Sequence, residues 1–109
     1  MTIETATLLR DLADIMDEHD DFPVPHDISI RHYDTLQVGY LFTKESDTAA
    51  ALETFRFFSR VGTKYSPWSN GSFVYFDAKL RTLAVHGQFS VSRPAFMSPS
   101  AEFLAAVTK

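Results

Sequence analysis

One stretch, SDTAAALETFRFFSRVG at residues 46–62, constrains the fold of this chain more than any other. Ser46 or Asp47 can accept hydrogen bonds from the first free amides of a helix, and the alanines at 49–51 have the highest intrinsic helix propensity. Gly62 follows the last predicted turn, and helices commonly end at a glycine. The stretch carries its own start and stop signals, and it predicts a central helix over 46–62.

The predicted helix is apolar on two sides. At about 100° per residue, one side has the spacing of a core stripe and consists of Thr48, Ala51, Leu52, Phe55, Phe58 and Ser59. Phe57 lies on nearly the opposite side with Ala50, Thr54 and Val61. A helix of this kind is either enclosed within its own chain or covered by another molecule.

The second apolar side is a candidate interface. Phe57, with Ala50 and Val61, would contact a second copy of the chain or another protein. The competing interpretation is that the N-terminal helix or the C-terminal arm covers Phe57 and makes it a core residue. Both interpretations follow from the same pattern.

Length and composition limit the class of protein. With 109 residues the chain is expected to form one domain, residues 1–109, with a core large enough to need no covalent staples. It has no cysteine, which excludes disulfides, thiolate zinc sites and a cysteine nucleophile. No apolar run is long enough for a membrane span, and the acidic N-terminus differs from a signal peptide. We therefore expect a cytoplasmic protein without a membrane partner.

The charge is unevenly distributed along the chain. Residues 1–27 hold one arginine and eight acids, a net charge of −7, whereas residues 28–109 hold nine basic residues and six acids, a net charge of +3. Residues 1–20 predict an acidic amphipathic helix whose apolar side consists of Leu8, Leu9, Leu12, Ala13, Ile15 and Met16. Its acidic face is interpreted as solvated. The alternatives are docking on a basic surface and mimicry of a row of phosphates.

The rest of the chain has the alternation of strands. Residues 28–42 predict a hairpin with one apolar face, and residues 63–91 predict further strands. Phe73 to Phe76 are apolar on both faces, which is typical of a strand covered on both sides or of a face awaiting cover. Residues 98–108 predict a short C-terminal helix. The expected fold is α+β, with a mainly antiparallel sheet of four to five strands packed against two helices.

The search for catalytic motifs is negative. The four histidines, at 19, 26, 32 and 86, lack the spacing of metal ligands, and the four glycines are isolated at 39, 62, 71 and 87. No serine lies in a nucleophile-elbow motif. We expect no catalytic, cofactor-binding or metal-binding residues, and therefore a protein that is not an enzyme.

Single-stranded nucleic-acid binding is the alternative function. If they share one sheet face, a platform of aromatic, basic and amide side chains would comprise Arg31, Tyr33, Gln37, Phe76, His86, Gln88 and Arg93. The chain is acidic overall and has no run typical of an RNA-recognition motif, which argues against this function.

The segment LLRDLADIMDEHDDFPVPHDISI, residues 8–30, resembles small uncharacterised proteins encoded by actinobacteria and their bacteriophages. The resemblance extends over residues 6–90 as a pattern of helix, hairpin, helix and strands. It implies a cytoplasmic accessory protein that binds a host protein. Together these observations predict a non-enzymatic protein-interaction module that binds a protein partner or itself as an oligomer.

Overall fold

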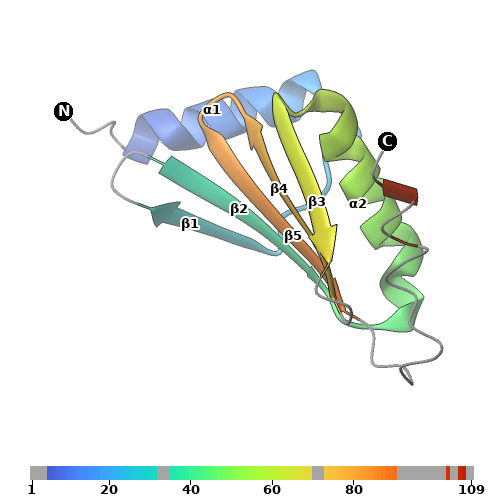
Figure 1. Cartoon of the computed structure of the whole chain (residues 1–109). Coiled ribbons are helices and arrows are strands. Elements are labelled where there is room, and N and C mark those ends of the chain that lie inside the picture. Colours follow the sequence, from blue (N-terminus) through green and yellow to red (C-terminus); the bar gives the residue numbers. More distant parts are fainter. Residues whose placement is uncertain (1–4, 32–34, 70–72, 91–102, 104–105, 108–109) are drawn as a thin grey trace.

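A computed structural model describes residues 5–31, 35–69, 73–90, 103 and 106–107, and it shows a twisted five-stranded sheet with two helices (Figure 1). In chain order the elements are α1 (Thr5–Glu18), β1 (Asp27–Arg31), β2 (Thr35–Phe42), the 3-10 turn η1 (Glu45–Asp47), α2 (Thr48–Val61), β3 (Lys64–Ser69), β4 (Phe73–Leu80) and β5 (Leu83–Ser90). The α+β class and the two helices agree with the sequence prediction.

The sheet is mixed rather than antiparallel. Its strand order is β1-β2-β5-β4-β3, and β2 pairs with β5 in parallel while the other three pairings are antiparallel. The reason is the even number of chain reversals between these two strands, because α2 returns the chain across the sheet before the β3-β4-β5 meander begins. The alternation in residues 28–42 and 63–91 correctly predicted strands, but it contains no information on which strands become neighbours.

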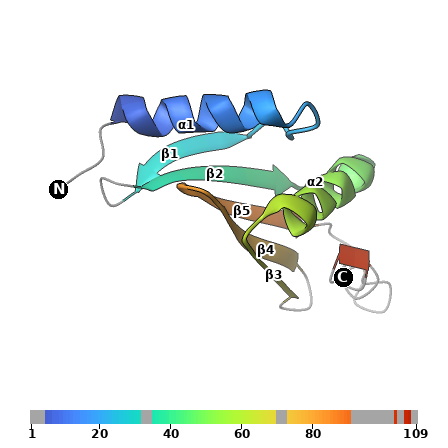
Figure 2. The same cartoon turned by 90° about the horizontal axis from the view of Figure 1, so that it is seen from above.

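Both helices cover the same face of the sheet (Figure 2). Alternate residues of β2, β4 and β5 point toward the helices and are buried, and they form one core with α1 and α2. The core positions on these strands include Leu36, Val38, Val74, Phe76 and Val85. No helix in the described part of the chain lies on the opposite face, which we call the open face.

Helix α1 packs on the sheet through one narrow stripe. Leu8, Leu12 and Ile15 are buried, as their spacing predicted, whereas Leu9, Ala13 and Met16 of the predicted apolar side are exposed. On one flank of this stripe, Asp11 accepts a hydrogen bond from Thr82 and forms an ion pair with Arg81 at the turn between β4 and β5. In the strand order, the turn between β4 and β5 lies on one side of β2, and β1 lies on the other side. The flank of α1 opposite Asp11 therefore faces β1.

Helix α2 ends as the sequence predicted, but for a different reason. Gly62 adopts an extended conformation, with φ −71° and ψ 144°, and its amide donates to the Phe58 carbonyl oxygen. A β-carbon at this position would lie 2.6 Å from that oxygen, so close backbone approach, and not left-handed geometry, requires glycine. At the other end, Asp47 occupies the N-cap position without a side-chain hydrogen bond.

Phe57, the centre of the predicted interface, is a core residue with 2% of its surface exposed. The connector between α1 and β1 covers it, because the rings of His19 and Phe22 each lie 5.5 Å from its ring at steep angles. The chain therefore encloses this side of α2 by itself. The predicted N-terminal helix over residues 1–20 includes His19 and so contributes part of the cover, whereas Phe22 lies in the connector that follows it.

The predicted C-terminal helix over 98–108 lies mainly outside the described residues. Two of its larger apolar side chains, Phe103 and Val107, are described, and both are buried. The Phe103 ring stacks on Phe89 at 4.4 Å, and the Val107 carbonyl oxygen accepts a hydrogen bond from the Tyr65 hydroxyl at 2.8 Å. Separately, neither α1 nor α2 has the length and apolar character that crossing a membrane would require.

Candidate functional site

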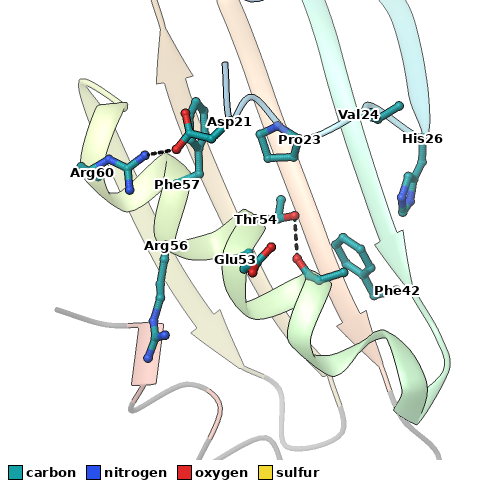
Figure 3. Close-up of a pocket in the computed structure, with 11 residues that line it drawn as sticks. Asp21, Pro23, Val24, His26, Phe42, Glu53, Thr54, Arg56, Phe57 and Arg60 are labelled. Carbon is teal, nitrogen blue, oxygen red and sulfur yellow. Dashed lines mark hydrogen bonds and ion pairs between the residues drawn. The ribbon is translucent and has the colours of Figure 1, made fainter. Parts of the chain in front are cut away.

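Three surfaces deserve comparison as functional sites, and the first is a groove of about 610 Å³ between α2 and the connector that follows α1 (Figure 3). Phe57 and Phe42 contribute apolar lining, and Ala50, one of the predicted interface residues, also lines the groove. Ala50 is exposed. Val61 is half-buried and does not line the groove. The predicted trio therefore does not form one surface.

Several polar groups around this groove have partners. Arg60 forms an ion pair with Asp21 at 2.6 Å, and its guanidinium lies 5.4 Å from the centre of the Phe57 ring. The Thr54 hydroxyl donates to the Ala50 carbonyl oxygen at 2.8 Å. Arg56 extends away from the centre of the groove (Figure 3). Glu53 and Arg56 also line the groove, and neither forms an ion pair with another described residue.

The second surface is the open face of the sheet. The registers place Arg31, Gln37, His86 and Gln88 on this face, as the nucleic-acid prediction required. Phe76 does not belong there, because it is fully buried on the helix side of β4. In a strand that is apolar at four consecutive positions, the sequence could not show which pair faces the helices. Tyr33 and Arg93 lie outside the described residues.

Sequence reasoning missed the aromatic residues that do occupy the open face. Trp68 stacks on Tyr75 with ring centres 4.1 Å apart and an interplanar angle of 20°, and the Tyr75 and His86 rings follow at 6.0 Å. Asp77 accepts a hydrogen bond from Trp68 Nε1 at 3.2 Å and pairs with His86 Nδ1 at 2.9 Å. Because these rings stack on one another, the faces that a nucleic-acid base would need are partly occupied.

The third surface is the free edge of β1 together with the neighbouring flank of α1. Ile28 and Ile30 are 47% and 40% exposed although they point to the helix side of the sheet, where their partners on β2 are fully buried. Leu9 and Met16, on the flank of α1 that faces β1, are 46% and 38% exposed. We call these four residues the β1 strip.

The two edges of the sheet are built differently. The free edge of β3 contains Pro67 in the middle of the strand, and proline supplies no backbone amide for a further strand. The five residues of β1, Asp27 to Arg31, include no proline and no glycine. β1 and β3 are thus the two edge strands of the described sheet, and only β3 contains a proline (Figure 1).

Two tyrosines tie the surrounding elements to the core. The Tyr40 hydroxyl donates to the Pro23 carbonyl oxygen at 2.8 Å, and burial raises the pKa of this phenol far above its usual value. Burial also raises the pKa of Tyr65 to about 12. Both phenols therefore remain neutral at physiological pH, and their role is structural.

The described residues include no group of three histidine, aspartate or glutamate side chains that could hold a metal ion. Comparison with protein-family models, with curated proteins and with solved structures finds no match for this chain.

Proposed function

We propose that this protein is a non-enzymatic protein-interaction module that binds its partner by adding a β-strand to the free edge of β1. The observation that carries the proposal is the contrast between the two sheet edges, since β3 is interrupted by Pro67 and β1 is open. Natural proteins commonly protect exposed apolar edge strands, because such strands pair with other chains. An edge left open beside an apolar strip fits a surface that is used.

The side chains of the β1 strip also support strand addition. An added strand would place its alternate residues over Ile28 and Ile30, and the flank of α1 that carries Leu9 and Met16 would border them. The partner segment would therefore have apolar residues at every second position. Backbone hydrogen bonds supply affinity in this mode, and the alternating side chains supply specificity.

The edge of β1 accounts for the observations better than nucleic-acid binding on the open face. That face carries Arg31, Lys64 and Lys79 against Asp27 and Asp77, which leaves few cations for phosphates. Its central rings stack on one another, as described above. The predicted cytoplasmic location and the host-protein partner are compatible with strand addition, but strand addition requires neither.

The test is sedimentation velocity of fluorescently labelled protein, measured in buffer and in bacterial lysate. The wild type is compared with Ile30→Lys, which places a charge in the β1 strip, and with Leu41→Lys, which places the same charge at an exposed position on the open face. Circular dichroism verifies that each variant is folded.

We expect the wild type and Leu41→Lys to sediment as a species larger than the monomer in at least one medium, and Ile30→Lys to sediment as a monomer in both. A wild type that is monomeric in both media would overturn the proposal. So would a complex that survives Ile30→Lys and is lost in Leu41→Lys, since the open face would then be the binding surface.

A further inference from the structure

On the basis of the proposed function, we infer that the strand added to β1 is the β1 strand of a second copy. The two strands would run antiparallel about a two-fold axis through Ser29, joining the sheets of both copies into one. The helices of both copies would lie on the same side of this joined sheet. The evidence is the sequence of β1, its charges, its apolar residues and one unpaired hydroxyl.

The sequence DISIR is complementary to itself in this arrangement. Pairing about Ser29 places Asp27 opposite Arg31 of the second copy, and Arg31 opposite the second copy's Asp27. Opposite charges at directly paired positions stabilise a sheet. In the described part of the chain, Asp27 has no ion-pair partner, and its side chain is exposed. It is therefore available to a second copy.

The same register extends the apolar surface across the seam. Ile28 would lie opposite Ile30 of the second copy on the helix side of the sheet, and the symmetry repeats this pair. The exposed flanks of both α1 helices, with Leu9 and Met16, would border the four isoleucines. Two copies of the β1 strip thus cover each other, which explains why apolar side chains are exposed beside a free edge.

Ser29 provides an independent observation. Its hydroxyl oxygen is buried without a hydrogen-bond partner, the one such side-chain atom among the described residues. A buried polar group is normally paired, so an unpaired one calls for an explanation. On the two-fold axis each Ser29 lies opposite its counterpart, and rotation about χ1 allows a hydrogen bond between the two hydroxyls.

Other registers satisfy these features less well. A shift by one residue would put the helices of the two copies on opposite sides of the sheet, because successive side chains alternate between faces. A shift by two residues would keep the helices together, but it would leave part of each strand unpaired and separate Asp27 from Arg31. Only pairing about Ser29 uses all five residues of both strands.

The assembly is also closed. A two-fold interface uses the same surface on both copies, so each β1 edge is consumed by the other. The edges that remain are the two β3 strands, which carry Pro67. The arrangement therefore ends at a dimer and does not grow into a filament.

Charge reversal tests the register. Asp27→Arg alone places like charges at both ends of the seam, and Arg31→Asp alone does the same with the opposite sign. We expect each single variant to raise the dimer dissociation constant at least about tenfold in sedimentation equilibrium, because two attractive pairs become repulsive. The double variant restores both pairs and is expected to return the constant to near the wild-type value. An equimolar mixture of the two single variants should form a heterodimer.

A double variant that associates no better than the singles would overturn the register. The wild type could instead be monomeric in buffer at every concentration but form a larger species in lysate, while Ile30→Lys stays monomeric in lysate. That result would overturn the second copy as the partner, and it would leave the proposed strand addition intact. Asp27 is exposed and Arg31 lies at the end of an edge strand, so all these variants are expected to fold, and circular dichroism verifies this.

Discussion

At the scale of single residues, close packing decides where side chains are tolerated. Gly87 on β5 faces the ring of Phe76, and a β-carbon there would lie 2.0 Å from Phe76 Cε1. That ring is fully buried, 4.5 Å from the ring of Phe55, and stacked on Phe58 at 5.5 Å. It has no free space into which to move, so the absence of a side chain at Gly87 is a packing requirement.

We therefore expect Gly87→Ala to lower the free energy of unfolding by about 1–3 kcal/mol, the usual cost of overpacking a core. The matched control is Gly39→Ala, because a β-carbon there would meet its nearest neighbour at 3.6 Å, an ordinary contact. The control is expected to change stability by less than about 0.5 kcal/mol. Urea unfolding at one fixed protein concentration measures both, and equal effects would contradict this account of the core.

Tyr65 makes stability depend on alkaline pH. Its pKa is raised from 10.0 to about 12 in the folded state by burial. Below about pH 10 both states keep the phenolic proton, and the stabilisation is complete. As the pH rises toward about 12, the unfolded chain releases the proton first, which favours unfolding, and the stabilisation is lost.

Tyr65→Phe is expected to show a smaller loss of stability between about pH 10 and 12 than the wild type. At neutral pH it should be less stable by about 1 kcal/mol, because the hydrogen bond to the Val107 carbonyl oxygen is lost. Urea unfolding across this pH range, with tyrosinate absorbance in parallel, provides the measurement. An identical alkaline loss in both proteins would contradict the assignment.

At the scale of elements, the sequence predicted the secondary structure of each segment better than it predicted which other segments pack against it. Residues 46–62 correctly predicted a helix that is apolar on two sides, and the alternation of β2 identified its buried positions. The cover that Phe22 provides for Phe57 could not be predicted, because Phe22 lies in a connector, directly before Pro23, and has no periodic pattern. Likewise, the continuous apolar run at the start of β4 concealed that Phe76 faces inward and Tyr75 outward.

The connector after α1 consequently acts as part of the core. Phe22 contacts both Phe57 and Phe58, with ring centres at 5.5 and 5.7 Å. We expect Phe22→Ala to reduce the free energy of unfolding by about 3–5 kcal/mol, as for other buried phenylalanines. The control is Val24→Ala, two residues away and 79% exposed, with an expected change below about 0.5 kcal/mol. A small effect in thermal or urea unfolding of Phe22→Ala would show that the connector does not hold α2.

At the scale of the whole molecule, the charge distribution and the strand order both bear on the proposed strand addition. The acidic residues 1–27 are largely on the helix side, where Asp11, Glu18 and Asp21 pair with arginines of later segments. The candidate site could not be read from the sequence, because the free edge of β1 exists only once β5 pairs with β2 from the other side. Its components, the alternating isoleucines and the two end charges, are nevertheless visible in residues 27–31.

The most direct test of the central claim is cross-linking at the two-fold axis, and the absence of cysteine makes a single introduced thiol unique. In the inferred dimer, Ser29→Cys brings two sulfurs together, since paired residues in antiparallel strands have α-carbons about 4.5–5.5 Å apart, within disulfide range. Ile28→Cys is the control, because each thiol would be roughly 8 Å from its counterpart. We predict that mild oxidation yields a covalent dimer with Ser29→Cys and little with Ile28→Cys. Equal cross-linking of both variants, or of neither, would contradict the account.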